Sequence, residues 1–183
     1  MSILLKRALD RAAVWHRGQL RKYPGVEVPY MSHLAGVAAI LSRHGFDEAV
    51  VAAGALHDAL EDCGVTYDEI ERAFGVDVAS LVRDVSEEDK ALSWEERKRA
   101  YIERFPHKPW RAQAISLADK IDNFQSIMVC AADFGDPWRM FKRGKSAQLE
   151  RFDALAANLT ALPAHALVDE FRSTLALVRE VPE

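Results

Sequence analysis

The feature that most restricts the fold of this chain is a helical spacing of apolar residues that recurs from one end to the other. In the first such segment, Leu5, Leu9 and Ala13 return at intervals of four and therefore lie on one stripe of a helix. No segment alternates apolar and polar residues over the length of a strand. The pattern predicts an all-α fold.

Start and stop signals divide the 183 residues into about nine helices. Ser32 is predicted to cap a helix that ends at Gly45, and Asp47 to cap the next, which runs to about Asp62. Capping-box patterns begin two further helices at residues 66–69 and 93–96. The remaining long helices are expected at about 109–130 and 163–179, and over 137–159 with Gly144 as a candidate point of division. We expect one domain over residues 1–183, with helices 137–180 packed on the part that precedes them.

Charge and apolar run length argue against several classes of protein. The 24 basic and 28 acidic residues give a net charge of −4, and no long Lys/Arg run offers a surface for nucleic acid. The apolar stretch Val50–Leu56 is far shorter than the ~18 residues of a membrane-spanning helix. The N-terminus does not have the residue order of a secretory signal. Cys63 and Cys130 have no paired spacing, so reduced thiols and a cytoplasmic location are expected.

Four ionisable residues interrupt the apolar helix that is expected near the centre of the bundle. His57, Asp58, Glu61 and Asp62 share one broad helix face, because they are spaced by one, four and five positions. A single His-Asp pair is usually a solvated charge at a helix end. Here the flanking residues are alanine, valine, glycine and leucine, and a buried carboxylate is costly unless it is paired or binds a metal.

Two other segments offer groups that would complete a metal site. His33 lies 24 residues before His57, and Asp119 lies 61 residues after Asp58. Two imidazoles and two carboxylates form a mixed nitrogen and oxygen set, which suits Mn²⁺, Fe²⁺ or Mg²⁺. A structural zinc site is not expected, because no closely spaced thiolates are present. Asn123 lies four positions after Asp119 and shares its helix face. Asp122 is left out of the predicted ligands, because one position along a helix turns it ~100° away from that face.

Taken in order, these motifs resemble the HD phosphohydrolase superfamily, and within it the stand-alone small alarmone hydrolases of the RelA/SpoT type. The resemblance covers about residues 5–130. The matching motifs are His16-Arg17-Gly18-Gln19-Leu20-Arg21-Lys22, Pro29-Tyr30-Met31-Ser32-His33, His57-Asp58-Ala59-Leu60-Glu61-Asp62, Phe74-Gly75 with Leu81-Val82, and Ala118-Asp119-Lys120-Ile121-Asp122-Asn123.

The resemblance implies a role for each matching position. One divalent ion, usually Mn²⁺, with Mg²⁺ or Fe²⁺ as alternatives, would be held by His33, His57, Asp58 and Asp119. Glu61 and Asp62 would activate the attacking water, and the nucleotide would face Arg21, Lys22, Tyr30 and Asn123. The implied reaction removes the 3′-diphosphate of guanosine 3′,5′-bis(diphosphate) and releases GDP and pyrophosphate.

Other functions stay open at this point. The same chemistry is compatible with a nucleoside monophosphate, a dNTP or NADPH as substrate, and a non-catalytic nucleotide sensor is a further alternative. The segment from Arg21 to Tyr30 is longer than in the bifunctional bacterial enzymes, which leaves the base contacts open. Two interpretations remain for the basic residues Lys142, Arg143 and Lys145: a solvated basic patch, or a site that binds the phosphates of the substrate. The same two interpretations apply to Lys90.

Overall fold

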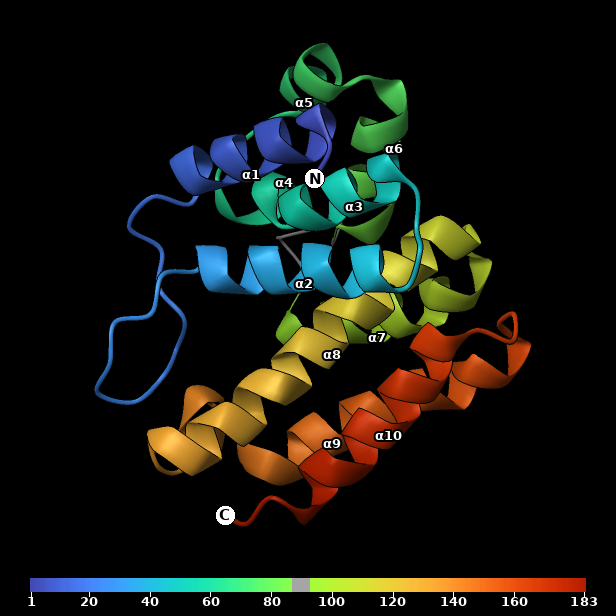
Figure 1. The fold of residues 1–183 in the computed structure, drawn as a ribbon. Helices are drawn as coiled ribbons and strands as arrows, with labels where there is room; N and C mark the ends of the chain where they lie inside the picture. The colour runs from blue at the N-terminus through green and yellow to red at the C-terminus, as the bar shows by residue number, and fades with distance from the viewer. Residues whose placement is uncertain (87–92) are drawn as a thin grey trace.

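The structure, a computed structural model, describes residues 1–86 and 93–183, so Lys90 lies outside the described residues (Figure 1). Within these ranges the only β-type pairing is an isolated bridge between Leu20 and Pro29, and the predicted all-α fold is confirmed. The α-helices are α1 (Ile3–Trp15), α2 (Met31–Arg43), α3 (Glu48–Leu56), α4 (Ala59–Asp62), α5 (Tyr67–Phe74), α6 (Val76–Val85), α7 (Trp94–Arg104), α8 (Trp110–Asp133), α9 (Gly144–Ala156) and α10 (Ala166–Glu180). Short 3-10 helices are η1 (Phe105–His107), η2 (Pro137–Met140) and η3 (Ala157–Ala161).

Most of the predicted helix ends are where local capping chemistry places them. Both capping boxes form, with Thr66 before α5 and Ser93 before α7. The Asp47 carboxylate accepts hydrogen bonds from the first backbone N–H groups of α3. Gly45, just after α2, has a φ of +77°, a left-handed conformation that favours glycine.

Several predicted boundaries are wrong. The segment 137–159 is divided into η2, α9 and η3, with Gly144 at a φ of +68° as the point of division, and the last helix begins at Ala166 and not at Pro163. Helix α2 begins at Met31, before Ser32, because Tyr30 already has helical dihedral angles and its carbonyl accepts the N–H of His33. The helix predicted from Asp47 to Asp62 is divided into α3 and α4 at His57 and Asp58. The ring of His57 donates to the carbonyl of Gly54, which competes with the backbone ladder at this point. The break therefore coincides with the residues that carry the chemistry.

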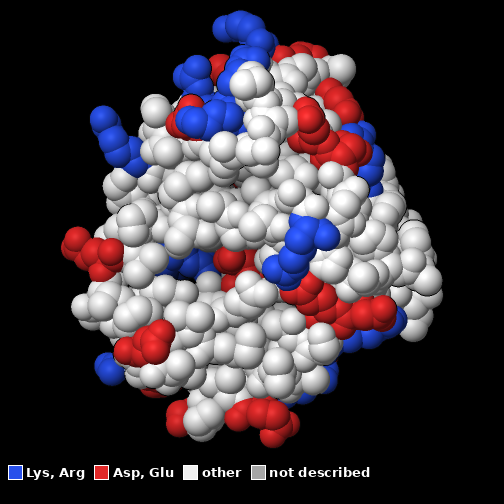
Figure 2. Space-filling model, viewed as in Figure 1, with Lys and Arg blue, Asp and Glu red and all other residues white. Residues whose placement is uncertain are grey.

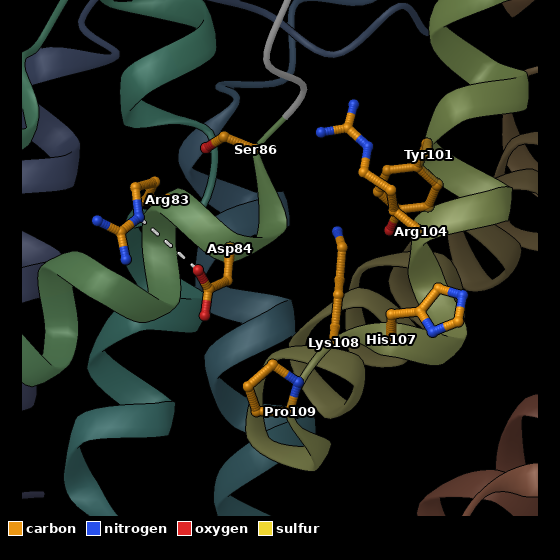
Figure 3. Close-up of a pocket in the computed structure, with 8 residues that line it drawn as sticks. All are labelled: Arg83, Asp84, Ser86, Tyr101, Arg104, His107, Lys108 and Pro109. Atoms are coloured by element: carbon orange, nitrogen blue, oxygen red, sulfur yellow. Dashed lines mark ion pairs between the residues drawn. The ribbon is translucent and has the colours of Figure 1, made fainter.

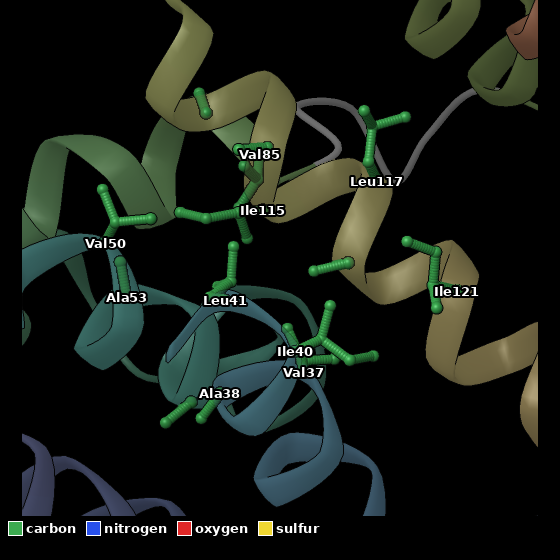
Figure 4. Close-up of a cluster of buried hydrophobic side chains, with 14 of the residues drawn as sticks. Val37, Ala38, Ile40, Leu41, Val50, Ala53, Val85, Ile115, Leu117 and Ile121 are labelled. Carbon is green, nitrogen blue, oxygen red and sulfur yellow. The ribbon is translucent and has the colours of Figure 1, made fainter. Parts of the chain in front are cut away.

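Helix α3 is the centre of the packing. It contacts α1, α2, α6 and α8, and every residue from Val50 to Leu56 is buried. Figure 4 shows α2, α3, α6 and α8 directing Leu41, Val50, Val85 and Ile115 into one shared core. Each such buried side chain contributes about 1.5–3 kcal/mol relative to leaving it in water. This core holds α2, the α3–α4 junction and α8 in a fixed relation.

The C-terminal helices α9 and α10 lie on the side of α8 that faces away from α2 and α3 (Figure 1). Helix α10 packs along α8 and contacts α9, and Figure 1 shows this pair below α2 and α3. On the face drawn in Figure 2, acidic and basic side chains are interspersed. None of the described helices has both the length and the apolar character that a membrane crossing requires.

Candidate metal centre and nucleotide cavity

Two imidazoles and a carboxylate from two separate segments of the chain converge beside the core. His33 lies in the first turn of α2, and His57 and Asp58 form the junction between α3 and α4. One ligand atom from each lies within 4.8 Å of the others, and we call this group the His/Asp cluster. The Oδ2 atom of Asp58 is 3.1 Å from Nε2 of His57 and 3.7 Å from Nε2 of His33. Asp119 of α8 lies beside the cluster, with Oδ1 3.4 Å from Nε2 of His33.

The second ring nitrogen of each histidine is already occupied. Nδ1 of His57 donates to the carbonyl oxygen of Gly54 at 2.8 Å, and Nδ1 of His33 donates to Oδ2 of Asp122 at 2.5 Å. Because a carbonyl oxygen only accepts, the proton of a neutral His57 lies on Nδ1 and the Nε2 lone pair is free. Nε2 of His57 is buried and has no hydrogen-bond partner among the described residues. Both rings are thus oriented as metal-binding histidines are, and the donor set fits a divalent ion.

Opposite charges control the ionisation of the cluster. Burial lowers the pKa of His57, but Asp58 and Asp119 outweigh it and raise that pKa to about 9. The pKa of His33 is raised in the same way by Asp119 and Asp122 against the effect of burial. The pKa of Asp58 is lowered, since His57 and His33 outweigh its own burial. Without an ion, protons on the imidazoles therefore balance the carboxylates.

Binding of a divalent ion is expected to release protons. A metal takes the lone pair of neutral Nε2, whereas His57 with a pKa of about 9 is protonated at pH 7. Each released proton makes the affinity rise about tenfold per pH unit below that pKa. Titration calorimetry with Mn²⁺ in buffers of different ionisation enthalpy measures the number of protons. A value of zero at pH 7 would contradict this ionisation state.

Asp122 is a positioning residue that sequence reasoning left out of the site. Its side chain reaches His33 because α2 has a glycine, Gly36, where the two helices meet. A Cβ atom on Gly36 would overlap Oδ1 of Asp122. Asp122 and Asp119 do point in different directions from α8, as helical rotation requires. Both nevertheless reach His33, Asp119 at Nε2 and Asp122 at Nδ1.

Substitution of Gly36 by alanine is therefore expected to weaken metal binding without touching a ligand. Loss of the partner of a metal-binding histidine typically costs about 10–100-fold in affinity. Alanine itself favours a helix, so the loss arises from displacement of Asp122. Calorimetry with Mn²⁺ should show weaker binding by Gly36→Ala but not by Ala35→Ser, an exposed control on α2. In an Asp122→Ala background the additional effect of Gly36→Ala should largely disappear, and persistence of the full effect would argue against this contact.

The cluster lies at the wall of a cavity of about 290 Å³, the cluster cavity. Glu61 lines this cavity, whereas Asp62 lines a neighbouring one and accepts a hydrogen bond from Nε2 of Gln19 at 2.7 Å. The structure thus separates two carboxylates that the sequence placed in one role. The cluster cavity is also lined by three lysines, Lys22, Lys98 and Lys120. A cavity with an ion site and several cations suits a phosphorylated ligand.

All four residues that were predicted to contact the nucleotide line a second cavity of about 410 Å³, which we call the loop cavity. They are Arg21, Lys22, Tyr30 and Asn123. Arg21 is held by α8, since it donates to Oδ1 of Asn123 at 3.2 Å and to Oγ of Ser126 at 2.7 Å. The hydroxyl of Tyr30 donates to Oδ2 of Asp58 at 2.6 Å. Burial and Asp58 raise the pKa of Tyr30, so its hydroxyl stays protonated as a donor. Lys22 lines both cavities and has no ion-pair partner among the described residues.

Lysines around Tyr101 were not predicted from the sequence. Tyr101 of α7 lines the cluster cavity and also a third cavity of about 250 Å³ between α6 and η1. Figure 3 shows Lys108 reaching into that third cavity between Asp84 and Arg104. Nζ of Lys108 lies 4.5 Å from the centre of the Tyr101 ring, and Nζ of Lys120 lies 5.4 Å from it. Burial, Arg104 and Lys120 lower the pKa of Lys108 to about 8. The position of Lys120 next to Asp119 was the one feature of the sequence that could have placed it in the site. Helix α7 carries many charged residues, and no pattern distinguishes Lys98 among them.

Comparison with known proteins identifies relatives over most of the chain. A family model described as the HD domain matches residues 8–135. The guanosine-3′,5′-bis(diphosphate) 3′-pyrophosphohydrolase of Drosophila melanogaster is 44% identical over 66% of this chain and 68% of its own length. The human protein of the same name is 41% identical over 70% of this chain and 72% of its own.

A solved structure extends the similarity to the whole fold. It is that of a metazoan ortholog of SpoT, described as hydrolysing ppGpp, the bis(diphosphate) above. It is 33% identical and covers 100% of this chain and 98% of its own, with a TM-score of 0.83. Together with the HD-domain match, these similarities show that the chain belongs to the HD-domain family and to its RelA/SpoT-type members.

Proposed function

We propose that this protein is a metal-dependent hydrolase of guanosine 3′,5′-bis(diphosphate) (ppGpp) that releases pyrophosphate from the 3′ position. The observation that carries the proposal is the His/Asp cluster in the wall of a cavity that also presents Glu61 and lysines, within a RelA/SpoT-type chain. We assign His33, His57, Asp58 and Asp119 as the residues that would hold the ion, and Mn²⁺ as its identity. Nitrogen and oxygen donors without thiolates support a metal of this class.

The bound ion would supply a Lewis acid that offsets phosphate charge and lowers the pKa of water. Glu61 would accept the proton of the attacking water, and its place in the wall of the cluster cavity supports this role. The new bond joins the water oxygen to the phosphorus next to the ribose, and the bond from that phosphorus to the 3′ oxygen breaks. The 3′ oxygen then takes up a proton, so the products are GDP and pyrophosphate.

The lysines of the cluster cavity would bind the diphosphate that leaves. Lys120 remains charged in spite of burial, because Asp119 raises its pKa. Lys22 and Lys98 reach the same cavity from the loop before α2 and from α7. Ammonium groups act as point charges toward phosphate oxygens and so stabilise the negative charge that the reaction transfers to pyrophosphate.

The direct test uses purified protein, Mn²⁺ and ppGpp, with the products separated by ion-exchange chromatography. Equal amounts of GDP and pyrophosphate are expected, and removal of the ion by a chelator should stop their formation. The same assay with a nucleoside monophosphate, a dNTP and NADPH tests the alternative substrates. Hydrolysis of one of these but not of ppGpp would assign the site to another nucleotide. Binding of ppGpp without any product would favour a sensor.

We also propose a cytoplasmic location. Cys63 and Cys130 are both free thiols in the structure. Burial raises the pKa of each thiol, with nearby Asp62 and Asp136 adding to it. Unreactive, unpaired thiols are typical of reducing compartments, which supports this assignment.

A further inference from the structure

A wide basic cavity lies next to the two cavities already described. Its volume is about 760 Å³, and its lining comes from the loop before α2, from α7, from η2, from α9 and from the segment that joins η2 to α9. No acidic residue of the described chain lines it. The cationic side chains of this basic cavity are Lys22, Lys98, Arg139, Lys142, Arg143 and Arg151.

The basic cavity adjoins the proposed active site and shares lining residues with it. Lys22 lines the cluster cavity, the loop cavity and the basic cavity, so all three meet at this side chain. Lys98 is shared by the cluster cavity and the basic cavity. Met140 and Phe141 are shared by the loop cavity and the basic cavity. One ligand with three arms can therefore occupy all three spaces.

Three of the cations have no partner among the described residues that would balance their charge. Among the described residues, Arg143 pairs with Glu95 and Arg151 donates to Gln148. Lys22, Arg139 and Lys142 form no hydrogen bond or ion pair with any described residue. Like charges that gather in one hollow repel one another, and a bound polyanion removes that cost. The arrangement thus favours a ligand group with several negative charges.

The shape of the substrate indicates which part of the nucleotide would occupy the basic cavity. In the proposed reaction the 3′-diphosphate occupies the cluster cavity, and the loop cavity, which the ring of Phe141 lines, receives the base. The remaining arm of the nucleotide is its 5′ chain of phosphates. We propose that the basic cavity binds this 5′-polyphosphate and makes the enzyme selective for nucleotides that carry it. This inference rests on the proposed function.

Lys145 lies in the same short basic run as Lys142 and Arg143 but does not belong to the proposed phosphate site. The sequence grouped Lys142, Arg143 and Lys145, yet Nζ of Lys145 donates to the carbonyl oxygen of Val181 at 2.7 Å and lies over the ring of Trp138. Lys145 does not line the basic cavity, whereas Lys142 and Arg143 do. The short basic run is therefore divided between a structural contact and a ligand site.

The test pairs a double variant with substrates that differ only at the 5′ position. Arg139→Ala with Lys142→Ala removes two exposed side chains, so the fold is not at risk. The substrates are guanosine 3′-diphosphate without 5′ phosphates, ppGpp, and its 5′-triphosphate counterpart. A double variant of Lys6→Ala and Arg172→Ala, exposed elsewhere, removes the same charge and serves as the control.

The wild-type protein is expected to show a KM that falls with each added 5′ phosphate. The double variant should raise KM for both 5′-phosphorylated substrates by about tenfold or more, since each lost charged hydrogen bond costs several-fold. Its effect should be confined to those substrates, and the control should behave as wild type. An equal rise in KM for guanosine 3′-diphosphate, or no rise with any substrate, would overturn the proposal.

A binding measurement separates this proposal from the proposed function. If the wild-type protein hydrolyses none of the three substrates, the proposed function fails. Calorimetry with inorganic tripolyphosphate then tests the cavity alone. Binding that is lost in the Arg139 and Lys142 double variant but kept in the control supports a polyphosphate site, whereas equal binding by both variants rejects it.

Discussion

Replacement of Asp58 by asparagine is expected to abolish tight metal binding and nearly all hydrolysis. Asp58 is the carboxylate that faces both imidazoles, at 3.1 Å from His57 and 3.7 Å from His33. Asparagine has the same shape and still accepts the hydrogen bond of Tyr30, but it lacks the negative charge. Loss of an outer partner alone costs about 10–100-fold in metal affinity, so loss of a direct ligand should exceed a hundredfold. We expect kcat/KM to fall by about a thousandfold.

Calorimetry with Mn²⁺ and the chromatographic assay measure the two effects together. Asp10→Asn removes an exposed carboxylate on α1 and is the matched control, with no expected change. Circular dichroism and thermal unfolding show whether the variant keeps the fold. A folded Asp58→Asn protein with wild-type affinity for Mn²⁺ and wild-type activity would refute the assignment of the cluster as the metal centre.

Glu61→Gln is expected to remove activity while leaving the metal bound. Glutamine fills the same space in the cluster cavity but cannot accept a proton from water. A general base typically contributes about 100- to 10,000-fold, so kcat should fall within this range with KM little changed. Because the His/Asp cluster does not include Glu61, affinity for Mn²⁺ should remain within a few-fold of wild type.

Asp62→Asn is the informative comparison, since the sequence places both carboxylates in one motif. Asp62 lines the loop cavity and acts through Gln19, so its loss should cost about tenfold in kcat, less than that of Glu61. Single-turnover rates for the two variants, with metal content measured on the same samples, decide between them. A larger loss in Asp62→Asn than in Glu61→Gln would exchange the two roles.

Much of the fold followed from local sequence chemistry. Helical periodicity, two capping boxes and Gly45 each depend on residues a few positions apart, so they can be recognised without knowledge of any long-range contact. The break at His57 and Asp58 was not predicted, because the four ionisable residues keep a helical spacing through it. It depends on a ring-to-carbonyl hydrogen bond that only the folded geometry provides.

The sequence by itself determined the ionisable residues of the site, since four such groups in apolar surroundings must find partners when they are buried. Only the tertiary structure decided how they are used. The crossing of α2 and α8 at Gly36 brings Asp122 to His33, 89 positions away in the chain. The loop before α2, helix α7 and the segment before α9 bring Lys22, Lys98 and Lys142 to the wall of one basic cavity. Such contacts join distant segments, and no local pattern records which distant segments will meet.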